Sequence, residues 1–180
     1  DAVEGWRIVD GSLEFTRDVS LAGLVWNLFS PFGSGVLDLM TKEKFRDFEL
    51  ALEWNVSPGG NSGIFYRVPD EKEDVGWFRA PEMQVLDDAA HADGQLDKRR
   101  AGDLYDIVAS SRRVVKPAGE WNALDVTIDG KTISVYVNGE LVNEGTNLVD
   151  LPGRFGLESE FGPVQFRNVR LTPIEATASK

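Results

Sequence analysis

Residues 48–55 of the chain, FELALEWN, alternate between large apolar residues and polar or small ones. An extended chain turns successive side chains to opposite faces, so the large apolar residues of this run all lie on one face. These residues are Phe48, Leu50, Leu52 and Trp54. The run therefore predicts a β-strand with one face toward a core and one polar face.

A second apolar run, Ser62 to Arg67, follows the loop Ser57-Pro58-Gly59-Gly60-Asn61. Proline fixes φ, glycine permits positive φ and asparagine tolerates the left-handed region, and together these residues are typical of a turn. We therefore predict that residues 47–67 form a hairpin of two long strands. In this hairpin one side belongs to the core and the other carries polar groups.

Three dipeptides also mark turns: Asp10-Gly11, Asp129-Gly130 and Asn138-Gly139. Such pairs suit the two-residue type I′ hairpin turn, which needs positive φ at both central positions. They predict paired strands within residues 6–15 and 121–142. Further strands are expected within 21–29, 36–39, 81–87 and 103–108, and a last pair at 155–161 and 164–171 around Gly162-Pro163.

About a dozen short strands, with no helical stretch longer than a turn or two, indicate an all-β protein. An antiparallel two-sheet sandwich is the economical way to bury so many half-apolar strands. No repeat or linker-like run divides the chain, and 180 residues suit one domain with a substantial core. We expect a single domain over residues 1–180, with frayed tails at 1–5 and 175–180.

Composition excludes several classes of function. A net charge of -11 and a pI near 4.6 argue against a nucleic-acid partner, which requires clustered Lys and Arg. The chain has no cysteine, which excludes disulfides, a thiolate nucleophile and a cysteine-based zinc site. It has no apolar run of about 18 residues, so membrane insertion by a helix is not expected. Asp1 rather than Met at the start is typical of a processed or trimmed N-terminus.

The expected strands carry many carboxylates, and alternation places several of them on shared faces. If the strands present these groups to one side, the carboxylates converge and their repulsion raises some pKa values, as general acid/base chemistry requires. Ordinary outward-facing residues of antiparallel strands give the same pattern, so strand parity leaves both interpretations open. The pairs that share a face are Glu49 with Glu53, Glu82 with Gln84, and Glu158 with Glu160.

Six segments of the chain, in order, resemble the 3-keto-disaccharide hydrolase family, a bacterial domain family formerly of unknown function. The segments are GWRIVDGSLEF, KFRDFELALEWNVSPGGNSGIFYRV, PEMQVLDD, HADGQLDKRRAGDLYD, KPAGEWNALDVTIDGKTISVYVNGELV and GLESEFGPVQFRNVRL. The resemblance covers nearly the whole chain, and the six motifs are specific when taken together. It implies a concanavalin A-like jelly-roll sandwich that is secreted, periplasmic or on the cell surface, with a concave sheet as the sugar-binding face.

Two chemistries are compatible with a carboxylate-rich face. In direct glycoside hydrolysis, two carboxyl groups flank the scissile bond. In the chemistry that the resemblance implies, the sugar is already oxidised at C3, so a base removes the acidified C2 proton, the aglycone leaves C1 by elimination, and water then adds. That route needs a base, an acid for the leaving oxygen, and a cation, donor or metal at the enolate oxygen. The spacing of the residues does not choose between the two routes.

The candidate catalytic residues are Glu82, Glu160, His91 and Glu53. His91 is the only histidine, and it lies in a polar loop where solvated surface is the ordinary role. The family pattern has H-x-D at this place followed by a tyrosine that matches Tyr105, which indicates a site loop. His91 is then a candidate base or metal ligand.

The candidate substrate-binding residues are Arg67, Gln84, Tyr105, Glu158 and Asn61. The resemblance also places an arginine at Arg67, where it can bind sugar hydroxyls or the enolate in a bidentate manner, although a salt bridge is the simpler role. Asn61 can equally close the turn before its strand. At Glu158 the family commonly has glutamine, and the extra carboxylate can help hold a divalent cation such as Ca²⁺. No other cofactor is expected.

We therefore expect an enzyme that cleaves glycosidic bonds of an oligosaccharide or glycoside, above all of a 3-keto-glycoside. One alternative is a non-catalytic, lectin-like carbohydrate-binding module of the same fold, and another is a structural interaction domain. If the chain is an enzyme, we expect a groove with clustered carboxylates and at least one raised pKa. If it is a binding module, we expect an aromatic platform, and if it is an interaction domain, a broad apolar patch.

Overall fold

The computed structural model describes residues 5–16, 38–69 and 80–175, and within them it contains strands and short helical turns. None of these turns has the length or apolar character that a membrane-spanning helix needs. The one 3-10 helix that bears on the site is Ala92–Gln95. The strands are β1 (Trp6–Val9), β2 (Ser12–Phe15), β3 (Leu39–Met40), β4 (Phe48–Val56), β5 (Asn61–Val68), β6 (Glu82–Leu86), β7 (Asn122–Asp129), β8 (Thr132–Val137), β9 (Glu140–Gly145), β10 (Arg154–Leu157) and β11 (Val164–Pro173).

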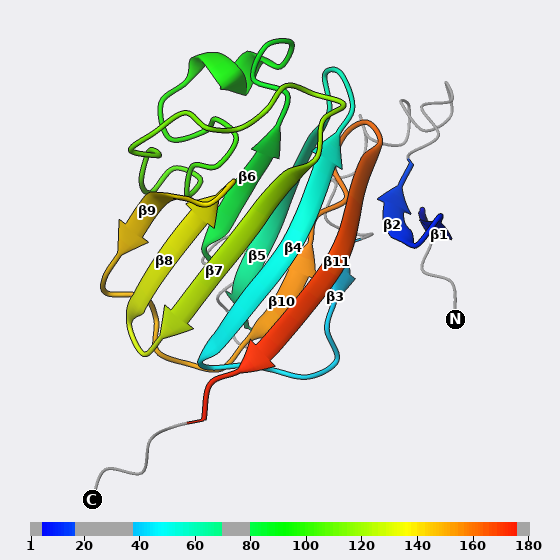
Figure 1. Cartoon of the computed structure of the whole chain (residues 1–180). Coiled ribbons are helices and arrows are strands. Elements are labelled where there is room, and N and C mark those ends of the chain that lie inside the picture. The colour runs from blue at the N-terminus through cyan, green and yellow to red at the C-terminus, as the bar shows by residue number, and fades with distance from the viewer. Residues whose placement is uncertain (1–4, 17–37, 70–79, 176–180) are drawn as a thin grey trace, which may run out of the picture.

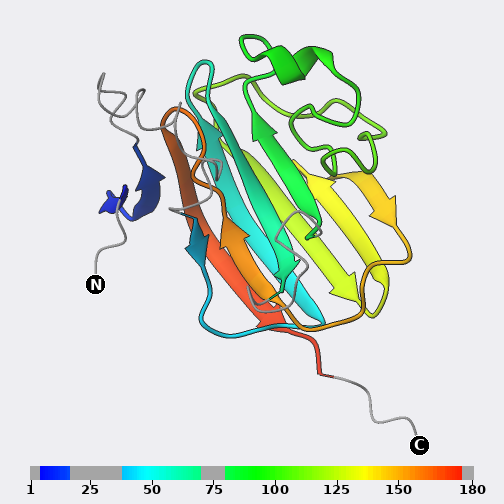
Figure 2. The ribbon, with the colours of Figure 1, turned by 180° about the vertical axis from the view of Figure 1, so that it is seen from behind.

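The strands form two antiparallel sheets that pack face to face as a jelly-roll sandwich (Figure 1), which confirms the predicted fold class. The larger sheet has seven strands in the order β1-β2-β11-β4-β7-β8-β9. The smaller sheet has four, in the order β3-β10-β5-β6, and Figure 2 shows it from its own side. The loops between β6 and β7 gather at one end of the sandwich, beside the ends of β6 and β9.

The core lies between the two sheets and is built from the apolar faces that the alternation predicts. On β4, Phe48, Leu50, Leu52 and Trp54 are all at most 3% exposed. All three X-Gly dipeptides mark turns between paired strands, and Asp10-Gly11 and Asn138-Gly139 have positive φ at both residues, as predicted. The turn at Asp129-Gly130 is shifted by one residue, because Asp129 pairs with Thr132 and the central residues are Gly130, with positive φ, and Lys131. Burial of this many large side chains supplies the main driving force for folding.

The predicted hairpin over residues 47–67 is wrong. Strand β4 pairs with β7 and β11 in the larger sheet, whereas β5 pairs with β6 and β10 in the smaller one. The loop between them closes with a bond from the Gly60 N–H to the Ser57 carbonyl, 2.9 Å long, and carries the chain from one sheet to the other. Both strands direct apolar faces into the same core, so alternation identifies the buried face but not the neighbouring strand.

Two other expectations on strands differ from the structure. The last predicted pair is wrong, because β10 belongs to the smaller sheet and β11 to the larger one. In place of a strand over residues 103–108, the chain has isolated bridges from Leu104 to Met83 and to Val108. The expected strand within residues 21–29 lies outside the described residues. Only the end of the run expected at 36–39 is described, where β3 begins at Leu39.

Candidate functional site

The face of the smaller sheet that points away from the core carries most of the candidate site residues. On β5, Ile64 and Tyr66 belong to the core, so Asn61 and Gly63 face the other way. The same alternation on β6 puts Met83 in the core and turns Glu82 outward. Gln84 on β6 and Glu158, which directly follows β10, obey the same rule, because Val85 and Leu157 belong to the core.

The register of the smaller sheet brings these residues into neighbouring rows. The Glu158 N–H donates to the Gly63 carbonyl at 2.9 Å, and Gly63 in turn pairs with Gln84. One row further along β5, the Asn61 side-chain Nδ2 donates to the Glu160 carboxylate. The structure therefore brings together five of the predicted residues: Glu82, Gln84, Glu158, Glu160 and Asn61.

The carboxyl groups on this face hold protons more tightly than free carboxyls do. Burial raises the pKa of Glu82 to about 8, with Glu160 and Asp38 adding repulsion. Burial also raises the pKa of Glu158 to about 10, with repulsion from Glu82 and Glu160 contributing. The pKa of Glu160 is raised too, mainly by burial, while nearby His91 acts in the opposite direction. A site that keeps some carboxyls protonated near neutral pH can supply both an acid and a base.

Asp38 is a member of this cluster that sequence reasoning missed. It directly precedes β3, and its carboxylate accepts from the backbone N–H of Ser159 at 2.8 Å and from the Ser159 hydroxyl at 3.1 Å. Burial raises its pKa. The available signal was the single acidic residue in the otherwise apolar run Val36 to Met40. Because β3 is only two residues long, that run gives little periodicity.

The loop that follows β6 brings His91 to the edge of the cluster. His91 Nδ1 accepts the backbone N–H of Asp93 at 3.2 Å and so caps the helix Ala92–Gln95. A ring nitrogen that accepts a hydrogen bond carries no proton, so the neutral imidazole has its proton on Nε2. In that tautomer Nε2 carries the proton and is a hydrogen-bond donor.

Tyr105 lies beside the same loop and next to β6. Its backbone N–H donates to the Glu82 carbonyl at 2.9 Å, and its hydroxyl donates to the Asp93 carboxylate at 3.2 Å. Burial raises the pKa of Tyr105 to about 12, with Asp93 contributing. The Arg99 guanidinium lies 5.2 Å from the centre of the tyrosine ring. Tyr105 thus stays protonated and links the His91 loop to the strand that carries Glu82.

Glu53 does not join the cluster, and the expectation that it shares a groove with Glu82 is wrong. It lies on β4 in the larger sheet, on the face that points away from the core. Its carboxylate accepts from Arg167 Nε at 2.5 Å and from Asn168 Nδ2 at 3.0 Å. The bond from Arg167 lowers its pKa, and the Arg167 guanidinium in turn lies 3.9 Å from the centre of the Trp121 ring. These contacts give Glu53 a local structural role on the opposite side of the molecule.

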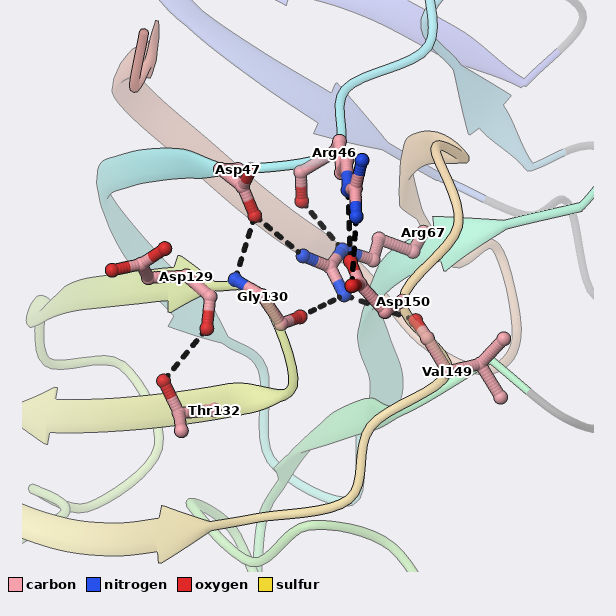
Figure 3. A network of polar contacts seen from close by, with 8 residues as sticks. All are labelled: Arg46, Asp47, Arg67, Asp129, Gly130, Thr132, Val149 and Asp150. Carbon is pink, nitrogen blue, oxygen red and sulfur yellow. Dashed lines mark hydrogen bonds and ion pairs between the residues drawn. The ribbon is translucent and has the colours of Figure 1, made fainter. Parts of the chain in front are cut away.

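Arg67 does not face the cluster either, and the structure gives it a different role (Figure 3). Its side chain is 3% exposed and donates to three carbonyls: that of Arg46 at 2.5 Å, that of Gly130 at 2.7 Å and that of Val149 at 3.0 Å. It also pairs with the Asp47 carboxylate at 3.1 Å. Arg67 therefore links β5 of the smaller sheet to the segment before β4 and to the β7–β8 turn of the larger sheet. A single arginine at the end of a strand gives no sign in the sequence of which carbonyls it will reach.

The described residues do not include a set of side chains arranged to bind the divalent cation that the sequence suggested. Within residues 5–16, 38–69 and 80–175, no three His, Asp or Glu side chains are arranged to hold a metal ion. The acidic groups beside Glu82 are instead distinguished by their raised pKa values.

The protonation of Glu158 predicts how stability depends on pH. Its pKa is about 10 in the folded chain against an ordinary 4.5, so between these values the folded state binds the extra proton and stability falls as pH rises. Replacing Glu158 with Gln should therefore reduce the fall in melting temperature between pH 5 and pH 9. Thermal unfolding followed by circular dichroism at both values measures this fall.

Glu144, at an exposed position of β9 in the other sheet, provides the matched control for that experiment. Glu144→Gln should keep the wild-type difference in melting temperature between the two pH values. An unchanged difference in Glu158→Gln would mean that Glu158 ionises in the folded chain as it does in the unfolded chain.

Comparison with known proteins adds relatives in sequence. The model of the 3-keto-alpha-glucoside-1,2-lyase-like domain matches residues 1–172. A 3-keto-disaccharide hydrolase of Bacteroides thetaiotaomicron is 40% identical over an alignment of 151 residues, and the match covers 77% of this chain and 49% of that protein. The chain thus spans about half the length of the curated relative that it matches.

Solved structures share the fold. A putative glycosyl hydrolase from Parabacteroides distasonis has a TM-score of 0.78 at 20% identity, covering 96% of this chain and 85% of its own. The carbohydrate-binding module CBM66 from Bacillus subtilis has a TM-score of 0.59 at 14% identity, covering 94% of this chain and 92% of its own. At these identities the likeness concerns the sandwich architecture alone.

Proposed function

Because this chain belongs to the 3-keto-alpha-glucoside-1,2-lyase-like domain family, we propose that it cleaves the glycosidic bond of a 3-keto-glycoside on the outer face of its smaller sheet. The observation that carries the proposal is the group of carboxyls at Glu158, which is buried, and at Glu82 and Glu160, which are half-buried; the pKa values of all three are raised. A keto-sugar is uncharged, so it suits a face on which several acids remain protonated.

The proposed reaction begins with a base. Although burial raises its pKa, Glu160 is the residue best suited to remove the C2 proton, because the Asn61 amide hydrogen bond to its carboxylate and the nearby His91 both favour the ionised form. The electron pair released at C2 passes into the C3 carbonyl to give an enolate. Protonated Glu158 is a donor on this face that can bind the enolate oxygen, and His91, in the loop beside Glu160, offers a second donor through its Nε2–H.

The second step needs an acid. When the enolate collapses, the C1–O bond breaks and the leaving oxygen takes a proton, which Glu82 supplies because its pKa of about 8 keeps it protonated at neutral pH. Water then adds its hydroxyl to C1 of the unsaturated sugar and gives its proton to the Glu82 carboxylate, while Glu160 returns the proton that it removed to C2. The acid and the base are both regenerated, so the cycle balances without any redox partner.

The choice of a keto-sugar rests on the relative from Bacteroides thetaiotaomicron, which is a 3-keto-disaccharide hydrolase. Incubation with 3-keto-trehalose or a 3-keto-glucoside, beside the unoxidised sugar, tests it by mass spectrometry of the products. We expect release of the aglycone from the oxidised sugar alone. Turnover of the plain sugar alone would instead favour direct hydrolysis by two carboxyls.

A carbohydrate-binding module is the second candidate, since CBM66 shares the fold. Binding of the sugars without turnover of either would support it. A module that only binds has no use for buried carboxyls with raised pKa values, because each costs stability at the pH where it ionises. The raised pKa values therefore favour an enzyme over a binding module.

A further inference from the structure

The Glu82 side chain does not stand straight up from its strand. Directly across from Glu82 on β5 is Phe65, and Gly63 lies two residues along, opposite Gln84. The Glu82 carboxyl nevertheless lies over Gly63 rather than over Phe65, since a Cβ built on Gly63 would be 2.8 Å from the Glu82 Cδ and 2.9 Å from its Cγ. The side chain therefore leans diagonally across β5.

Nothing in the backbone requires glycine at this position. Gly63 lies inside a regular antiparallel strand and does not adopt positive φ, in contrast to Gly59 in the loop just before that strand, with φ of +73°. Glycine in a strand interior weakens the strand and often marks a close approach of another group. Here the approaching group is the Glu82 side chain, so glycine at position 63 leaves space for it.

The direction in which the Glu82 side chain leans is important for the site. The Gly63 carbonyl accepts the Glu158 N–H at 2.9 Å, so the strand position beneath the Glu82 carboxyl is bonded to Glu158. We propose that Gly63 is a positioning residue: its missing side chain seats the Glu82 carboxyl over β5 beside Glu158, and so holds the general acid in place. This inference rests on the proposed function for the role of Glu82, but the placement itself can be tested without turnover.

Titratable groups approach the Glu82 carboxyl from every described element around it. They come from β5, from the segment after β10, from the residue before β3 and from the loop beyond β6. These groups are Tyr66, Glu158, Glu160, Asp38 and Asp106. If Glu82 is displaced from Gly63, it leaves part of this acidic and buried surrounding, and its pKa falls toward the ordinary value.

Gly63→Ala is the variant that tests the placement. The added methyl meets the mobile end of a side chain, so we expect the fold to survive and Glu82 to move aside. In a ¹³C NMR titration, with Glu82→Gln used to assign the resonance, the Glu82 midpoint should fall from about 8. The kcat/KM for a 3-keto-glucoside should fall about 100-fold, as a misplaced catalytic group allows.

Gly156→Ala provides the matched control. Gly156 lies on β10 and faces the same side of the sheet, but a methyl there meets the Met40 side chain, which does not titrate. The Glu82 midpoint should therefore remain at its wild-type value in Gly156→Ala. A folded Gly63→Ala variant with an unchanged Glu82 midpoint would overturn the inference, whether or not the wild-type protein turns over keto-sugars.

A double variant covers the case in which Gly63→Ala fails to fold. If the methyl clashes with Glu82, then Gly63→Ala combined with Glu82→Ala removes the obstacle and restores a folded protein by circular dichroism. An unfolded double variant, beside a folded Glu82→Ala, would show that position 63 needs glycine for another reason. Absence of turnover by the wild type, with a lowered midpoint in Gly63→Ala, would reject the proposed reaction but keep the placement.

Discussion

Glu82→Gln should lose almost all turnover of a 3-keto-glycoside while keeping the wild-type fold. Glutamine has the same shape as the protonated acid, so it fills the place over Gly63, but it does not donate a proton to the leaving oxygen. General acid catalysis typically contributes about 10²–10⁴-fold, and a loss in kcat of that size is expected. Steady-state kinetics at neutral pH, with circular dichroism of the same sample, measures both parts of the prediction.

Glu53→Gln is the control for that experiment, because it makes the same chemical change on the larger sheet. Glu53 contacts Arg167 and Asn168 on the far side of the sandwich, so kcat should remain at the wild-type value. Full activity in Glu82→Gln would remove Glu82 from the mechanism. Loss of activity in Glu53→Gln as well would point to a general effect of lost acidic charge rather than to one acid.

The local part of the architecture could be predicted from the sequence. Alternation depends only on neighbouring residues, which is why it correctly placed Phe48 and Trp54 in the core. The Asp10-Gly11 and Asp129-Gly130 turns join strands that follow one another directly, so their pairing was also correct. Alternation also picked out Glu82, Glu158 and Glu160 as carboxylates on shared faces, and the family resemblance led to the same fold class.

The non-local part could not be predicted from alternation. Parity shows that two glutamates share a face of one strand, but it does not show which strand lies beside it or in which sheet. Glu53 and Glu82 both alternate with apolar residues along their strands, yet β4 and β6 belong to different sheets. Asp38 precedes a strand of two residues, which is too short to show the alternation of apolar and polar residues. Gly63 leaves space for the Glu82 side chain because it has no side chain of its own, and no sequence pattern indicates this.

Arg67→Met should destabilise the protein strongly without touching the proposed site. The buried guanidinium holds the carbonyls of Arg46, Gly130 and Val149 and the carboxylate of Asp47, and Met supplies no donor for any of them (Figure 3). Removing one partner of a buried ion pair typically costs about 3–5 kcal/mol, and we expect a loss of that order in the free energy of unfolding. Urea unfolding at neutral pH measures it.

Arg112→Met is the matched control, because Arg112 pairs with Glu140 at 2.6 Å while both side chains are more than half exposed, at 64% and 51%. Water screens such a pair, so the free energy of unfolding should change far less than in Arg67→Met. Arg67→Lys separates charge from geometry: lysine keeps the positive charge, but its single ammonium lacks the planar fork that reaches several carbonyls at once. If Arg67→Lys is as stable as the wild type, the positive charge alone explains how Arg67 stabilises the fold. If it is nearly as unstable as Arg67→Met, the stabilisation depends on the several directed hydrogen bonds that join β5 to the larger sheet.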